Sequence, residues 1–145
     1  MKKIFSTLHT NNRTDTAILV LRIGIALLML THGYPKLKSF MQGDTGFMSV
    51  FGFSEPVSMG FAIFAEFFCS LLILFGLGTR LAVIPLSITM LVAVLQVHGQ
   101  DAFSKKELAL HFLLVYIILF ILGSGKYSID QFLLRKKNYK IKLNS

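Results

Sequence analysis

Apolar and polar positions alternate along this chain in blocks, and the apolar blocks cover residues 17–34, 57–77, 81–97 and 108–123. A helix needs about 20 residues to cross the hydrocarbon core of a bilayer, within a usual range of about 17–25. The second block meets that length. The first and third lie at its lower limit, and the fourth is slightly short unless Glu107 or Ser124 extends it. The pattern predicts an all-α integral membrane protein, a bundle of four transmembrane helices.

The polar segments predict one transmembrane domain with a tail at each end. Residues 1–16 form the first tail, residues 17–127 the four-helix domain, and residues 128–145 a basic second tail. The first tail is polar, and no small-residue cleavage site follows the first apolar block. We therefore expect that block to remain as a helix rather than to act as a signal peptide. Only residues 78–80 separate the second and third blocks, which predicts a tight antiparallel hairpin.

Two shorter amphipathic helices are predicted outside the bundle. Phe47, Val50 and Phe51 follow a spacing of i, i+3 and i+4, which indicates a short helix over residues 45–53 on the outer surface, with its aromatic face in the headgroup boundary. In the second tail, Ser128 with a glutamine three residues later is a capping-box pattern that predicts the start of another helix.

Composition supports the membrane interpretation, since 54% of the residues are hydrophobic and only 15% are charged. A soluble domain is usually about 45–50% apolar and about 25% charged. The alternative is a soluble helical bundle with a very apolar core, but four such blocks would leave almost no polar face.

The basic residues predict the orientation in the membrane. Ten lie in segments that would share one side: Lys2, Lys3, Arg13, Arg80, Lys126, Arg135, Lys136, Lys137, Lys140 and Lys142. Four lie in the other two loops: Lys36, Lys38, Lys105 and Lys106. The positive-inside rule then places both termini in the cytoplasm. We interpret the net charge of +8 as topology and lipid contact rather than nucleic-acid binding.

Two charged residues interrupt the apolar blocks, Arg22 in the first and Glu66 in the second. A charge at the centre of a transmembrane helix costs about 2.5–3.5 kcal/mol on insertion scales, so we expect the two residues to face each other or a wet cavity. Arg22 lies deeper toward the cytoplasm, and its side chain leans toward the helix N-terminus. A direct pair therefore needs a shifted helix boundary or a bridging water.

His32, His98 and His111 belong to three different helices and are all expected near the outer leaflet. Together with Glu66 and Arg22 they would form a polar path from the outer surface to mid-membrane. Such paths carry protons or bind polar headgroups, and this chemistry suits a quinone, whose reduction takes up protons. In the structural alternative, Arg22 and Glu66 merely lock the bundle and the histidines are interfacial residues.

A metal site is a weaker hypothesis, built from Glu107, His111 and His98 as three ligands. The chain has no HExxH or CxxC motif, and its single cysteine, Cys69, cannot form an intrachain disulfide. No flavin, haem or iron–sulfur signature is present, so any electrons must come from a partner or stay on the quinone.

Several segments together resemble the DoxX family, in order and in spacing. They are LRIGIALLMLTHGYPKL at residues 21–37, GDTGFMSVFGFSEP at 43–56, AEFFCSLLILFGLGTRLA at 65–82, MLVAVLQVHG at 90–99 and ELALHFLLVYIILFILGSGKYSID at 107–130. The resemblance implies a small four-helix protein of a bacterial-type inner membrane. The polar positions of the family correspond to Arg22, His32, Lys36, Glu66 and His98. The family often has Gly-Gly where this chain has Cys69 and Ser70.

The resemblance also implies a role near membrane redox chemistry, because the family includes the membrane subunit of a thiosulfate:quinone oxidoreductase. We therefore expect a quinone- or quinol-interacting component of an oxidoreductase or oxidative-stress system. In this hypothesis Glu66, Arg22 and His98 are the catalytic residues, while His32, Lys36, Glu66 and His111 contact the quinone.

The rival hypothesis is a non-enzymatic membrane scaffold, or an accessory subunit for partner proteins. A small-solute transporter is a third class, disfavoured because four short helices leave little room for alternating access. The expected partners are membrane lipid and protein or redox subunits, with a second copy of the chain as a further candidate.

Overall fold

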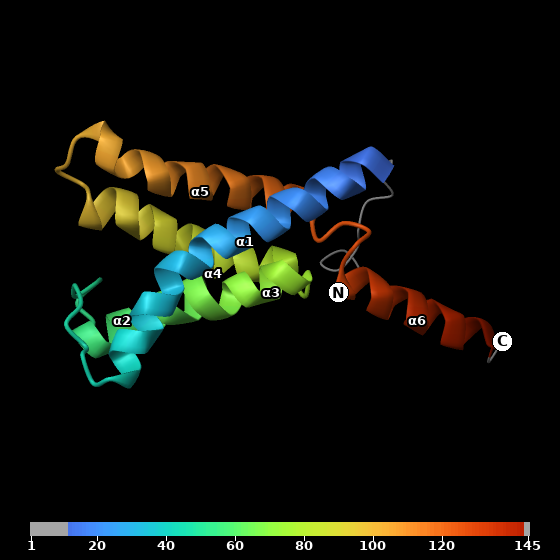
Figure 1. The fold of residues 1–145 in the computed structure, drawn as a ribbon, viewed down its shortest axis with the longest axis horizontal. Helices are drawn as coiled ribbons and strands as arrows, with labels where there is room; N and C mark the ends of the chain where they lie inside the picture. Colours follow the sequence, from blue (N-terminus) through green and yellow to red (C-terminus); the bar gives the residue numbers. More distant parts are fainter. Residues whose placement is uncertain (1–11, 144–145) are drawn as a thin grey trace.

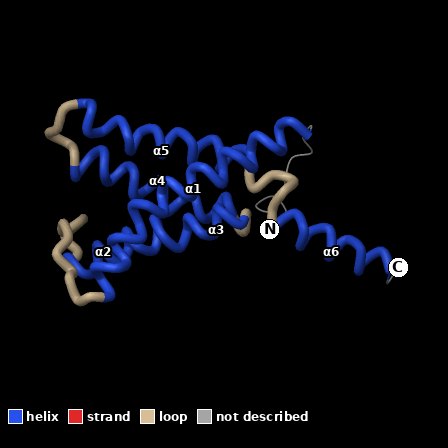
Figure 2. The backbone as a smooth tube through the Cα atoms, in the orientation of Figure 1, coloured by secondary structure: helices blue, strands red, loops and turns tan. Residues whose placement is uncertain are grey.

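The computed structural model describes residues 12–143, and the side chains among them as far as residue 136. Helices and their connecting loops account for this part of the chain, which contains no strand (Figure 1, Figure 2). The elements in order are α1 (Asn12–Met41), α2 (Glu55–Ile63), η1 (Phe64–Cys69), α3 (Ser70–Phe75), α4 (Thr79–Val92), η2 (Ala93–Val97), α5 (Phe103–Leu122) and α6 (Ile129–Leu143). The elements η1 and η2 are π-helical turns.

The helices pack as two pairs that meet near their middle. In one pair α1 lies along the continuous helix formed by α2, η1 and α3, and in the other α4 lies along α5. Contacts of α4 with η1 and α3, and of α1 with α5, join the pairs. Figure 1 shows the pairs diverging toward the end that carries the loop before α2 and the turn between α4 and α5. The buried core lies where they meet, and includes Ile25, Met29, Ala65, Ile73, Val83, Leu86, Phe112 and Leu119.

Three helices of the described part are long and apolar enough to cross a membrane: Asn12–Met41, Glu55–Phe75 and Thr79–Val97. They correspond to the first three predicted spans. Large apolar side chains such as Val20, Leu28 and Leu95 point outward from them, as expected for helices in contact with lipid. This chain is therefore a membrane protein with several apolar helices.

The fourth predicted span corresponds to α5, which is 20 residues long and begins before the predicted start at residue 108. Three charged residues near its start, Lys105, Lys106 and Glu107, fall within every 18-residue stretch of this helix. Because of these charges α5 is not among the candidate spans, although its apolar residues pack against α4 and α1.

Helix α1 is longer than the predicted span of residues 17–34, because it continues through Pro35 to Met41. A proline inside a helix leaves a backbone carbonyl without its usual donor one turn earlier, but the helix tolerates the loss. As a consequence, Lys36 lies on the helix rather than in a loop. The helical rise places it about 21 Å along the axis from Arg22.

The predicted outer helix over residues 45–53 is wrong, because this segment is an irregular loop. Gly52 and Phe51 have positive φ angles of 80° and 52°, which are incompatible with a right-handed helix. The Ser58 hydroxyl of α2 accepts a hydrogen bond from the Val50 backbone N–H at 3.1 Å, so the loop is tied to α2 instead.

The predicted helix in the second tail is confirmed as α6. The Gln131 backbone N–H donates to the Ser128 hydroxyl at 3.2 Å, as the capping-box pattern predicts. Before it, α5 ends at Leu122 and Gly123 leaves the helix with a φ of 79°. Figure 1 shows α6 extending away from the two helix pairs.

Candidate functional site

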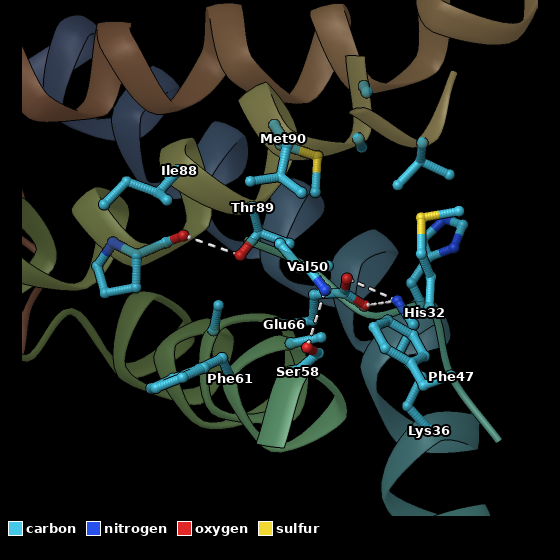
Figure 3. Close-up of a pocket in the computed structure, with 18 of the residues that line it drawn as sticks. His32, Lys36, Phe47, Val50, Ser58, Phe61, Glu66, Ile88, Thr89 and Met90 are labelled. Carbon is cyan, nitrogen blue, oxygen red and sulfur yellow. Dashed lines mark hydrogen bonds and ion pairs between the residues drawn. The ribbon is translucent and has the colours of Figure 1, made fainter. Parts of the chain in front are cut away.

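A cavity of about 680 Å³ lies between the two helix pairs. Its walls come from α1, the loop before α2, α2, η1, α4, η2 and α5, and they are mainly apolar and aromatic (Figure 3). The polar side chains that line it are His32, Lys36, Ser58, Glu66, Thr89, His98 and Lys105. The cavity thus gathers most of the polar positions predicted from the sequence, and it is the candidate site.

Glu66 lies buried in the wall of this cavity and forms an ion pair with Lys36. The Lys36 ammonium donates to both carboxylate oxygens, at 2.6 Å to Oε1 and 2.5 Å to Oε2. The Lys36 side chain is 29% exposed and its Nζ lies 6.0 Å from the centre of the Phe47 ring. The buried Glu66 carboxylate is therefore paired with a lysine whose side chain is partly exposed.

Gly33 explains why these two helices come close enough for the pair to form. A Cβ atom at this position would lie 2.7 Å from the Glu66 carbonyl carbon and 2.8 Å from the Phe67 backbone nitrogen. Only glycine therefore allows α1 to cross the backbone of η1 at this distance. Cys69 and Ser70, which follow on the facing helix, are both buried.

Both π-helical turns border the cavity. Glu66 belongs to η1, and Ala93 and Val97 of η2 line the facing wall. A π-helical turn shifts the faces of the residues that follow it, and such turns occur frequently at functional sites. The Thr89 hydroxyl, one turn before η2, donates to the Pro85 carbonyl at 3.0 Å (Figure 3).

Two of the three predicted histidines line the cavity. The His32 ring packs edge-on against Phe112, with centroids 5.9 Å apart. The His98 Nδ1 lies 2.7 Å from the Asp101 Oδ2. His111 does not line the cavity, and its Nδ1 faces the Glu107 carbonyl at 2.9 Å on the exposed side of α5. His111 therefore does not belong to the cavity, and the position of all three histidines near the outer leaflet stays a prediction. The fourth, His9, lies outside the described residues.

The predicted pairing of Arg22 with Glu66 is also wrong. The Arg22 guanidinium is buried at the opposite end of the helix pairs, where it donates to the Ser124 carbonyl at 2.6 Å and to the Tyr127 carbonyl at 2.7 Å. The side chains of Arg22 and Lys36 both lean toward the N-terminus of α1, which carries Arg22 away from Glu66 and Lys36 toward it. Gly76 faces the guanidinium, and a Cβ atom there would collide with it.

Two buried carboxylates at this end, Asp130 and Asp15, were not predicted from the sequence. Asp130 accepts hydrogen bonds from the Gly78 backbone N–H at 3.0 Å to each oxygen, and its own N–H donates to the Gly76 carbonyl at 3.1 Å. Asp15 accepts from the Lys126 backbone N–H at 3.3 Å. The position of Asp130 in the first turn of a predicted helix was the signal available. Asp130 ties the start of α6 to the turn before α4, whereas Asp15 and Arg22 tie the segment after α5 to α1.

Among the described residues, three buried hydroxyl groups lack a hydrogen-bond partner, those of Ser70, Thr79 and Tyr116. The Tyr116 ring stacks on Phe112, with centroids 6.1 Å apart, and Phe112 lines the cavity.

The predicted metal trio of Glu107, His111 and His98 does not come together. Over the described residues, no group of three histidine, cysteine, aspartate or glutamate side chains could hold a metal ion.

The family model for DoxX matches residues 17–99, which is more than half of the chain. That range begins within α1 and ends just after η2, and it contains the polar cavity residues His32, Lys36, Glu66 and His98. Neither the curated proteins nor the solved structures yield a match.

Proposed function

Because the chain belongs to the DoxX family, we propose that it is a quinone- or quinol-interacting membrane component of an oxidoreductase or oxidative-stress system. The observation that supports this most is the Lys36–Glu66 ion pair in the wall of a largely apolar cavity. A buried ionisable pair in a membrane protein is a mark of a functional site. Lys36 can donate a hydrogen bond to a quinone oxygen, and Glu66 can accept one from a quinol hydroxyl group.

The cavity fits the headgroup of a quinone in size and in chemistry. Sites for small molecules occupy about 300–1,000 Å³ and combine apolar walls with a few polar groups that orient the ligand. Here Phe47 and Phe112 supply flat apolar surface, and the Lys36 ammonium can donate to a quinone oxygen. When bound, a quinone supplies redox capacity, because it takes up two electrons and two protons. We assign the electrons to a redox centre in a partner protein.

The residues of the chain would bind the headgroup and move protons. The Lys36 ammonium donates to both oxygens of Glu66, and a ligand oxygen that accepts from this ammonium would leave the Glu66 carboxyl group without its partner and facing the ligand. His98 lies at the end of η2, where its Nδ1 is 2.7 Å from the Asp101 carboxylate. His32 is exposed beside the same cavity. These two rings would exchange protons with water at the outer surface.

We further propose that α5 completes a four-helix bundle in a bacterial-type inner membrane, with both termini in the cytoplasm. The distribution of basic residues supports this orientation through the positive-inside rule. Lys105 and Lys106 would lie at the outer end of α5, where long lysine side chains reach the headgroups. The cavity would then lie in the outer half of the bilayer.

The direct test is to purify the protein in mild detergent from quinone-containing membranes, extract it, and measure quinone by mass spectrometry. We expect quinone in the wild type, less in Lys36→Met, and least in Glu66→Gln. Glu107→Gln is the matched control, because this carboxylate is exposed and does not line the cavity. Each variant should be monodisperse on gel filtration before extraction. A folded wild type that carries no quinone, or a Glu66→Gln protein that retains it fully, would overturn the proposal.

The scaffold hypothesis is supported by a different observation, the exposed face of α6. Phe132 and Leu133 are exposed on this helix, and Arg135 and Lys136 follow them. If the chain holds a partner there, Phe132→Glu should remove a stoichiometric partner on co-purification while leaving the quinone content unchanged. A partner that stays bound to this variant would contradict docking on α6.

A further inference from the structure

The cavity has a polar end and an apolar end. Figure 3 shows His32, Lys36 and Phe47 together at one end, and Phe61 and Ile88 at the other. Glu66 and Thr89 lie between the two ends (Figure 3). A ligand that matches this order must be an amphiphile, with a polar head and an apolar extension.

The positions of the lining residues along their helices locate the apolar end of the cavity within the bilayer. Ile88 lies nine residues after the start of α4, which is about 14 Å along the helix axis. Lys36 lies near the other end of the molecule, in the last turns of α1. The apolar end of the cavity is therefore near the middle of the bilayer, and the polar end is nearer to one surface. A membrane lipid has the same order of polarity.

The apolar end also lies at the outer surface of the helices. Phe61 is 59% exposed, Phe64 is 52% exposed and Ile88 is 54% exposed, although all three line the cavity. They belong to α2, η1 and α4, which come from different helix pairs. In a chain that spans the membrane, this exposed surface faces lipid tails. The cavity consequently opens sideways into the bilayer between these helices.

We propose that the ligand is a membrane-resident amphiphile whose apolar tail leaves the cavity between Phe61 and Ile88, while its head lies beside Lys36 and Glu66. The proposal rests on the proposed function only for the identity of the head. Ligand would enter and leave through the bilayer rather than through the water at the outer surface. The side chains at this opening, those of Phe61, Phe64 and Ile88, would then contact the tail of the ligand and control its access to the cavity.

The test uses a quinone analogue with a photoreactive diazirine in its isoprenoid tail, incorporated into liposomes with the purified full-length protein. After irradiation, mass spectrometry should find the label on α2, η1 and α4 around Phe61, Phe64 and Ile88. Ile88→Trp should obstruct the opening and lower this labelling about tenfold, as a loss of about 1.4 kcal/mol of binding free energy would. Ile84→Trp is the control, because Ile84 is 43% exposed one turn earlier and does not line the cavity.

A phospholipid with the same photoreactive group in its acyl tail separates this inference from the proposed function. If the quinone probe labels the opening and excess unlabelled quinone competes, both proposals hold. If only the phospholipid probe labels the opening, the side opening holds and the quinone assignment fails. If the quinone binds but its tail labels other helices, or if Ile88→Trp and Ile84→Trp behave alike, the side opening is overturned.

Discussion

Glu66 and Arg22 are charged residues buried in apolar helices at opposite ends of the molecule, and the cost of burying each charge is offset in a different way. Glu66 pairs with a lysine that is partly exposed, and the pair borders a cavity. Arg22 is enclosed by backbone carbonyls of the segment after α5. A charge beside a cavity can change its partner when a ligand arrives, whereas a charge enclosed by backbone cannot. The comparison separates a candidate functional residue from a structural one.

Each end depends on a glycine, but for a different reason. Gly33 lets the backbone of η1 approach α1, which brings Glu66 within reach of Lys36. Gly76 has a φ of 68° and leaves room for the Arg22 guanidinium. One glycine therefore sets a distance between helices, and the other sets the space around a side chain.

The largest effect on stability is expected at the end of the molecule where backbone carbonyls enclose Arg22. Arg22→Met removes two hydrogen bonds from a charged donor, each contributing about 1.5–3 kcal/mol, so the free energy of unfolding should fall by about 3–6 kcal/mol. Unfolding in increasing denaturant, with the protein in detergent, measures this change. The control is Arg13→Met, which removes an exposed arginine of the same helix. Equal stability of the two variants would show that the Arg22 contacts do not hold the molecule together.

A smaller loss is expected at the cavity end. Breaking a buried ion pair by removing one partner costs about 3–5 kcal/mol, and water near the partly exposed Lys36 should reduce this to about 2 kcal/mol for Lys36→Met. Adding Glu66→Gln removes the unpaired charge, so the double variant should recover part of the loss. A double-mutant cycle measures the coupling. Additive single effects would mean that the two side chains are not paired in the membrane.

Gly33→Ala tests the close crossing itself. The added methyl group would meet the η1 backbone at 2.7 Å, and forcing extra volume into packed helices costs about 1–3 kcal/mol. The variant should also weaken quinone retention, because it separates Lys36 from Glu66. Gly24→Ala is the matched control on the same helix, since a Cβ there has no neighbour within 4 Å. A Gly33→Ala protein as stable as this control would contradict the crossing.

The smallest effect is expected for Tyr116→Phe. The Tyr116 hydroxyl is buried without a hydrogen-bond partner, so its removal should leave stability unchanged or raise it by about 1 kcal/mol. The thermal unfolding midpoint in detergent measures the difference. A clear decrease would instead reveal a partner for the hydroxyl, such as a buried water.

Local signals predicted the helices well, except at two places. Gly123 ends α5 and Ser128 caps α6 as their residue types indicate, because turns and caps depend on neighbours in the chain. The apolar spacing of residues 45–53 suggested a helix, yet the positive φ angles of Phe51 and Gly52 and the hydrogen bond from Val50 to Ser58 produce a loop. The first predicted span ends at residue 34, yet α1 continues through Pro35 to Met41.

A helical chain, apolar enough for a membrane and related to the DoxX family, could be read from the amino-acid sequence, because these properties follow from composition, spacing and segment order. The same reading identified Glu66, Lys36, His32 and His98 as polar positions of interest. The packing of the helices was needed to show that Lys36, rather than Arg22, reaches Glu66, and that His111 lies outside the cavity. Those choices depend on helix length, on π-helical turns and on the close crossing at Gly33, which arise from contacts between residues distant in the sequence.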